Sequence, residues 1–311
     1  LVGHSTGGLD ARLVASPGAA LGTTPEALAW LPRLRSVTMI NTPHYGTPLA
    51  KFFATVSGQR LLYALSALTF VGLSLGAPPM AVASAIVVAI GRLDRALGFE
   101  LSVLDRTTDA LLRLLDDTRS REVRAYLDAI KQDQGAILQL APEAMELMLA
   151  SASDRQGVRY QSTVSMAPPP SAGRFVRSSL GGPWGAASAT IFTALYGFTS
   201  RFDERYPCAA AFAGVDAEAA LTRSYGRAPG ARANDGVVPL RSQVWGKVVW
   251  AGYADHLDVL GHFRDDLAQT RGEPSEGRHT DWLASGADFD RARFGALADA
   301  IAGGMLESVR S

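Results

Sequence analysis

Short apolar runs alternate with stretches of helical periodicity along the chain. Runs typical of buried strands occupy residues 1–2, 36–40, 157–166 and 247–250. Helical spacing follows the first run, where Leu9 and Leu13 lie one turn apart within residues 7–14, and returns over residues 94–150, with Pro142 in a first helical turn. Another helical pattern begins at Phe289 and closes the chain. Strands alternating with helices predict an α/β fold.

Two further segments carry weaker signals. Residues 23–34 begin with Thr23 and Glu26 in the spacing of a capping box, with Pro25 near the first turn, and this pattern predicts a helix. Residues 167–233 are rich in Pro, Gly, Ser and Ala, which predicts loops and short helices.

Residues 61–91 contain no charged side chain. The sequence Gly-Ala-Pro-Pro at 76–79 divides them into two apolar halves, each shorter than the roughly 20 residues that cross a bilayer. A helix that is apolar all round must be buried or meet lipid. Three interpretations remain open: a lid over a lipid-binding cleft, an immobile core hairpin, or a membrane hairpin.

Composition and charge narrow the class of protein. Of 311 residues, 47% are hydrophobic and 19% are charged, as in globular proteins. The 30 basic and 30 acidic residues balance, so no net field favours nucleic acid as a partner. Cys208 is the only cysteine, which excludes an intramolecular disulfide and a thiolate-rich metal site.

The first residues contain the pattern Gly-x-Ser-x-Gly between a strand and a helix. This context is typical of a nucleophile elbow, in which a sharp turn exposes the hydroxyl of Ser5. We expect bulk at Gly3 and Gly7 to clash across the turn. The Thr6 N–H then lies at a helix N-terminus, where it can stabilise an oxyanion. The alternative is a glycine-rich structural turn.

A serine nucleophile needs a base, and the base needs an orienting acid. In the expected chain order, Asp235 in "NDGVVP" is the acid and His256 in "ADHLDVLGH" is the base. His262 is the rival base, because it follows the same predicted strand. Asp235 also fits an ordinary Asp-Gly turn. His44 comes too early for that order, and we expect it to line the site instead.

Four motifs in order, "GHSTGG", "NTPHYGTPLA", "NDGVVP" and "DHLDVLG", resemble those of the bacterial true lipases of the α/β-hydrolase superfamily. The resemblance spans residues 1 to about 263, apart from the lid region and residues 167–233. It implies the α/β-hydrolase fold from the nucleophile elbow onward, with a helical lid or cap insertion. The resulting domain prediction is core at 1–51, lid or cap at 52–150, and remaining core at 151–311.

The resemblance also implies roles for individual residues. Ser5, His256 and Asp235 would be nucleophile, base and acid, and Thr6 the first oxyanion donor. We assign substrate-binding positions to His4, His44 and Tyr45.

The beginning of the chain leads to a further expectation. Only two residues precede Gly3, whereas a parallel strand usually has five or six. In the lipases that the chain resembles, the elbow follows the fifth strand, and the second oxyanion donor lies in an earlier loop. We therefore expect this chain to be an N-terminally truncated part of a longer protein.

The same resemblance implies a calcium site. The acid two residues after the base corresponds to Asp258, and a second acid would come from Asp203 or Asp216. Calcium prefers six to eight oxygen ligands, and His262 stands where some relatives have an amide ligand. The alternative is that Asp258 hydrogen-bonds only its own loop. No cofactor is needed for the chemistry itself.

The predicted function is hydrolysis of carboxylic esters of lipids. An acyltransferase, a thioesterase or a polyester depolymerase would use the same three residues, and a non-catalytic membrane module is an alternative of another class. The predicted partners are a lipid ester or a lipid interface, and no stable protein partner or compartment is inferred.

Overall fold

The computed structural model describes most of the chain outside residues 56–107. The described residues are 1–55, 58–59, 61–63, 65–66, 108–110, 112–132, 135–180, 183–201, 208, 213–264, 278–279 and 281–310. Most of the uncharged stretch at 61–91 lies outside them, and so does Asp203.

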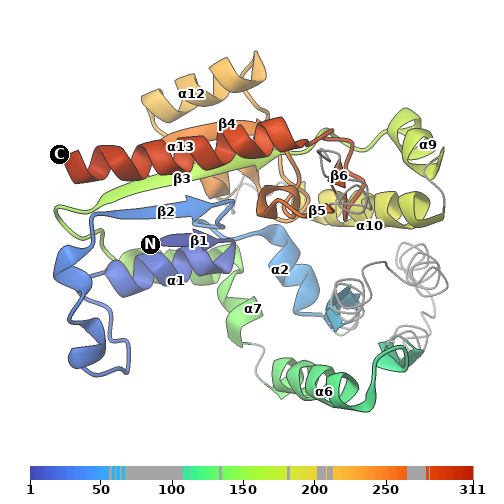
Figure 1. The fold of residues 1–311 in the computed structure, drawn as a ribbon, viewed down its shortest axis with the longest axis horizontal. Coiled ribbons are helices and arrows are strands. Elements are labelled where there is room, and N and C mark those ends of the chain that lie inside the picture. The colour runs from blue at the N-terminus through green and yellow to red at the C-terminus, as the bar shows by residue number, and fades with distance from the viewer. Residues whose placement is uncertain are drawn as a thin grey trace, which may run out of the picture.

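A four-stranded parallel sheet forms the centre of the fold (Figure 1). Its strands lie in the order β1-β2-β3-β4 and comprise β1 (Val2–His4), β2 (Ser36–Ile40), β3 (Arg159–Met166) and β4 (Lys247–Tyr253). Each overlaps one of the four apolar runs, so the predicted mixed α/β class is confirmed. A short antiparallel pair, β5 (Phe263–Arg264) and β6 (Arg278–His279), lies outside this sheet.

Helices cover both faces of the sheet. Val37 and Met39 are fully buried on the face that carries α1 (Thr6–Ala15), and α12 (Val215–Tyr225) packs on the same face near β4. The alternate face, which carries Ile40, packs against α13 (Arg291–Arg310). Because both faces are covered, the strands can be apolar nearly throughout, as the sequence pattern required.

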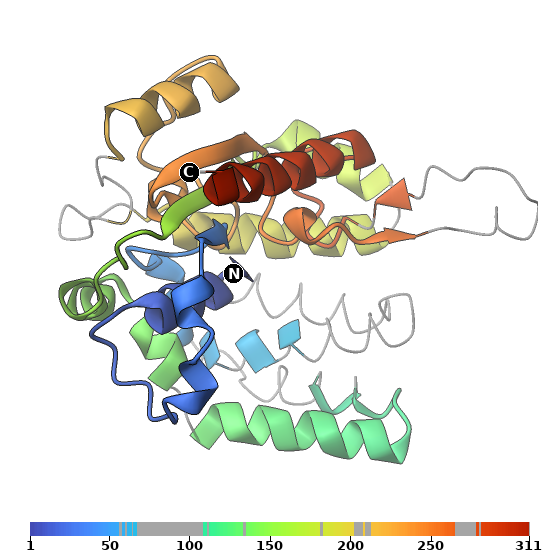
Figure 2. The same ribbon diagram turned by 60° about the vertical axis from the view of Figure 1, so that its left-hand side comes forward.

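The described residues between β2 and β3 form helices and no strand. They include α2 (Pro48–Phe53), α6 (Asp117–Gln132), α7 (Gly135–Gln139) and α8 (Pro142–Ser151). In both views α6 lies at the far side of the molecule from α13 (Figures 1 and 2). Within the described part of the chain, every helix is too short or too polar to cross a membrane.

Two predicted elements differ from the structure. Residues 23–34 form only two short 3₁₀ turns, Glu26–Leu28 and Leu31–Arg33, instead of one helix. Pro32 explains this, because it lacks an N–H and disfavours the α conformation at the residue before it. The region 167–233 holds longer helices than expected: α9 (Ala172–Leu180), α10 (Pro183–Thr199) and α12.

The carboxyl ends of the four strands bring distant polar residues to one edge of the sheet. Ser5 follows β1, Asn41 follows β2, and the loop with His256 follows β4. The backbone N–H of Ala167, just after β3, donates to the carbonyl of Asn234, which ties the loop of the predicted acid to the same edge.

Candidate active site

Ser5 occupies a strained turn between β1 and α1. Its backbone has φ 54° and ψ −127°, a conformation that a residue with a side chain rarely adopts. The Ser5 N–H donates to the carbonyl of Ile40 at 2.9 Å, which fixes the turn to the neighbouring strand. Such strain costs on the order of 1–3 kcal/mol and persists where surrounding structure enforces it, often at functional sites.

Two glycines near this turn have no room for a side chain, and only one of them, Gly3, is a glycine that the motif predicted to be tight. A Cβ on Gly3 would lie 2.1 Å from the carbonyl oxygen of Gly7, as expected. A Cβ on Gly7 would meet nothing within 4 Å, so the expected clash there is wrong. The tight position is Gly8 instead, where a Cβ would lie 2.0 Å from Oγ1 of Thr42.

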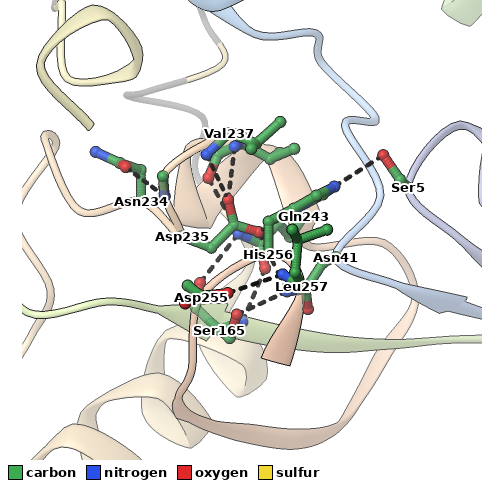
Figure 3. Close-up of polar contacts among 12 residues, drawn as sticks. Ser5, Asn41, Ser165, Asn234, Asp235, Val237, Gln243, Asp255, His256 and Leu257 are labelled. Atoms are coloured by element: carbon green, nitrogen blue, oxygen red, sulfur yellow. Dashed lines mark hydrogen bonds and ion pairs between the residues drawn. The ribbon is translucent and has the colours of Figure 1, made fainter. Parts of the chain in front are cut away.

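Ser5, His256 and Asp235 form a continuous line of hydrogen bonds (Figure 3). His256 Nδ1 lies 2.7 Å from Asp235 Oδ2, and His256 Nε2 lies 3.0 Å from Ser5 Oγ. Since the carboxylate can only accept, neutral His256 carries its proton on Nδ1. Its Nε2 is then an acceptor that can receive the proton of the serine hydroxyl.

The Asp235 carboxylate is fully buried and well supplied with donors. Its Oδ1 accepts from the N–H groups of Val237 at 2.9 Å and Val238 at 2.7 Å. Its Oδ2 accepts from Asn41 Nδ2 at 3.1 Å, in addition to His256. These donors compensate for the loss of water around the charge and fix the direction in which Oδ2 faces the imidazole.

Asn41 belongs to the same hydrogen-bonded group, although the sequence analysis did not single it out. It has φ 48°, and its Nδ2 also donates to Ser165 Oγ at 2.7 Å. Gln243 fastens the same region, since its amide bonds the backbone of Ser165 and the carbonyl of Val238. The signal that could have found Asn41 is a polar residue directly after a predicted parallel strand.

His4 contacts His256 rather than an open cleft. Its Nε2–H donates to the His256 carbonyl at 3.0 Å, and the two rings lie 4.7 Å apart. Burial, followed by the nearby charge of His256, lowers the pKa of His4 to about 4. His4 is therefore neutral at neutral pH and supports the loop of His256.

The variant His4→Gln is expected to lose less stability than the wild type when the pH falls from 6.5 toward 4. The unfolded chain takes up a proton near pH 6.5, whereas the native His4 resists until about pH 4. Stability is therefore intact above pH 6.5 and falls toward pH 4, by about 2 kcal/mol at pH 5 through this group. Urea unfolding of both proteins at pH 7.5 and pH 5 measures the difference; parallel losses would contradict it.

His44 and Tyr45, predicted to bind substrate, lie in a different cluster. His44 is fully buried, and its Nδ1 accepts from Arg12 Nη1 at 3.2 Å. The Arg12 guanidinium stacks on Trp245, 3.5 Å from the ring centroid, and the Tyr45 ring lies 6.1 Å from the same indole. Neither residue makes a described contact with Ser5 or His256, because the loop after β2 turns both side chains toward Trp245.

His262 and Thr6 complete the set of sequence candidates. His262 Nδ1 accepts from Trp282 Nε1 at 2.8 Å, and among the described contacts it bonds neither Ser5 nor Asp235. Thr6 is the first residue of α1. N–H groups in a first helical turn have no intrahelical acceptor, so the Thr6 N–H can face a developing oxyanion beside Ser5.

Three carboxylates gather beside the His256 loop. Asp255, Asp258 and Asp281 each offer an oxygen within 4.8 Å of the others. Asp258 Oδ2 accepts from the Asp255 N–H at 2.8 Å, and Asp255 Oδ1 accepts in return from the Asp258 N–H at 3.0 Å. Burial, and then the charge of Asp281, raise the pKa of Asp255 to about 7.

The structure places one of the two other expected acids away from this cluster. Asp216 is exposed on α12 and does not belong to it, Asp203 lies outside the described residues, and Asp281 is an acid of the cluster that the sequence analysis did not single out. Asp255 Oδ2 is buried and has no hydrogen-bond partner among the described residues. Oxygen donors alone are the chemistry that calcium requires, so these residues fit a calcium ion.

A cavity of about 440 Å³ opens beside the Ser5 turn. Thr6 and Asp10 of α1 line one part of it. Its apolar walls come from α1, where Leu9 and Leu13 lie, and from α8, where Met145 and Met148 lie. An apolar space therefore adjoins the residue that directly follows Ser5.

Comparison with known proteins finds matches among solved structures, one of which is distant in sequence. EstA from Clostridium botulinum matches with a TM-score of 0.43 and 19% sequence identity, over 93% of this chain and 63% of that chain. The chain thus spans less than two thirds of that structure's length. No protein-family model and no curated protein matches the sequence.

Proposed function

We propose that this chain carries the catalytic centre of a serine hydrolase that cleaves carboxylic esters of lipids. The observation that supports it best is the hydrogen-bonded line from Ser5 through His256 to Asp235, with Ser5 on a strained turn. A nucleophile, a base and an orienting acid within bonding distance are what acyl transfer through a serine requires.

In the proposed mechanism, Ser5 Oγ attacks the acyl carbon while His256 Nε2 takes the hydroxyl proton. Asp235 holds the Nδ1–H and stabilises the imidazolium that forms. The Thr6 N–H stabilises the oxyanion of the tetrahedral intermediate. The imidazolium then protonates the leaving alcohol, and an acyl-enzyme remains on Ser5. A water molecule, deprotonated by His256, releases the acid and restores the enzyme.

Pre-steady-state kinetics test the reaction class. A nitrophenyl ester should release one equivalent of nitrophenol per chain in a burst, followed by slower turnover, because acylation precedes hydrolysis of the acyl-enzyme. Release without a covalent acyl adduct on quenched protein would contradict the proposal.

The apolar cavity supports an acyl group of lipid type as part of the substrate. It adjoins Thr6, and α7 and α8, which belong to the region 52–150, form part of its wall. The proposal therefore assigns this region the role of a cap that binds the acyl chain, with a lipid surface as the natural partner.

Filling the cavity should shorten the preferred acyl chain. Ala144 lines it from α8, and Ala144→Trp is expected to lower kcat/KM for an octanoyl ester at least about tenfold, since each lost methylene contact is worth about 1 kcal/mol or more. Turnover of an acetyl ester should change little. The matched control is Ala150→Trp, at an exposed position of α8 that lines no part of the cavity. Equal effects of both variants on both esters would contradict the assignment.

The proposal includes a structural calcium ion held by Asp255, Asp258 and Asp281. Saturating calcium should raise Tm, because an ion bound only to the native state adds about 2.7 kcal/mol at one hundred times its Kd. Asp281→Asn should lose most of that rise, and Asp216→Asn, which removes an exposed acid elsewhere, should keep it. Melting curves of the three proteins with calcium or a chelator provide the measurement; identical curves for the wild type would contradict calcium binding.

A further inference from the structure

A second cavity, separate from the Ser5 turn, has a strongly cationic lining. Its volume is about 530 Å³, and it opens at the carboxyl ends of β3 and β4, where Met166 and Tyr253 form part of the wall. The carboxyl edge of a parallel sheet is where ligands of α/β proteins usually bind. The lining includes four arginines from three segments: Arg174 on α9, Arg227 and Arg232 in the loop after α12, and Arg293 on α13.

The positive charge in this cavity is largely uncompensated. Asp288 is the one acidic residue among the described lining residues. In the part of the chain that the structure describes, no ion pair joins any of the four guanidinium groups to a carboxylate. Arginine stays charged at any physiological pH, so four of these groups around one space repel one another. A bound anion would relieve that repulsion.

Two of the arginines are held in place by the cavity wall itself. Arg174 Nη1 donates to the carbonyl of Pro169 at 2.8 Å, and its side chain packs against Gly286. Arg293 Nη1 donates to the carbonyl of Ala287. A guanidinium has five N–H donors, so each of these two groups keeps donors for a ligand after fixing its own position.

The other two arginines are exposed and available. The side chains of Arg227 and Arg232 make no hydrogen bond within the described parts of the chain. The backbone of Arg232 is fixed, since its carbonyl accepts from Asn234 Nδ2 at 3.0 Å. The cavity therefore combines two anchored guanidinium groups with two that can close on a ligand.

We propose that this cavity binds a phosphate group, either free or as the phosphate monoester head group of a lipid. A dianionic phosphate presents three oxygens to the paired N–H groups of several arginines. A monocarboxylate has only two oxygens and one charge, and it matches fewer of the four groups. The site is independent of the proposed ester hydrolysis, because none of its arginines contacts Ser5 or His256 among the described contacts.

Calorimetric titration with inorganic phosphate tests this assignment, with acetate at matched ionic strength as the comparison anion. Phosphate should bind saturably at one site per chain and raise Tm, and acetate should bind far more weakly. The double variant R227Q/R232Q should bind phosphate at least about tenfold more weakly, since it loses two charge-assisted contacts. The matched control is R223Q, at an exposed arginine of α12 that does not line the cavity.

The stability and affinity of the variants distinguish loss of the site from loss of folding. Both replaced arginines are exposed, so the double variant without phosphate should melt at or above the Tm of the wild type. The single variant Arg232→Gln should show an intermediate loss of phosphate affinity. Absence of saturable phosphate binding, equal affinity for acetate, or an equal loss in R223Q would overturn the proposal. Sedimentation with phosphatidylcholine vesicles containing phosphatidate identifies the source: co-sedimentation that R227Q/R232Q abolishes assigns a lipid head group, and calorimetric binding without co-sedimentation assigns a soluble phosphate.

Discussion

Ser5→Ala is expected to lower kcat/KM for a nitrophenyl ester by roughly four to six orders of magnitude, the range found when one member of such a constellation is removed. The reason is geometric: Ser5 Oγ is the atom that lies 3.0 Å from His256 Nε2. Alanine keeps the Cβ and the strained backbone, so the loss should not come from unfolding. Steady-state kinetics with a matched melting curve measure both quantities.

Ser5→Gly is the matched variant for this prediction. Glycine adopts φ 54° without penalty, so this variant should be inactive and yet more stable than the wild type by about 1 kcal/mol. A loss of activity together with stability in both variants would indicate a structural role for Ser5.

His256→Ala is expected to cost nearly as much activity as Ser5→Ala, because the nucleophile and its base act as a unit. His262→Ala is the control. It removes the acceptor of the Trp282 N–H bond, which should lower stability by about 1 kcal/mol and change kcat/KM only slightly. Kinetics of both variants decide between the two histidines, and exchanged phenotypes would make His262 the base.

The strands were predictable because strands covered on both faces of a sheet appear in the sequence as short runs that are apolar nearly throughout. Val37 and Met39 face α1, and Ile40 faces α13, so the run at residues 36–40 is apolar or small throughout. The positions of Ser5, Asp235 and His256 in the sequence also indicated that the three lie close together. Ser5 and His256 each follow a predicted strand, and Asp235 precedes the strand that leads to His256.

Other features depend on tertiary contacts that a linear pattern does not contain. Asn41 reaches Asp235 only because β2 lies next to β3 in the sheet. His44 looked like a site residue, but its side chain is directed into the interior by Arg12. The Pro, Gly, Ser and Ala content of residues 167–233 predicts loops and short helices, but the apolar side chains of α10 pack in the core and stabilise a helix of 17 residues.

The glycine positions beside Ser5 also depend on a tertiary contact. The motif predicted a clash at Gly7, but the position without room for a side chain is Gly8, which packs against Thr42 in the loop after β2. The sequence alone does not reveal which loop approaches a given helix.

The measurement that tests the central claim most directly is covalent labelling of the protein with a fluorophosphonate, followed by peptide mass mapping. Such a reagent phosphonylates a serine that a neighbouring base activates. We expect one adduct per chain, on the peptide that contains Ser5, and its disappearance in His256→Ala as well as in Ser5→Ala. An adduct on another serine, or undiminished labelling of Ser5→Ala, would contradict this claim.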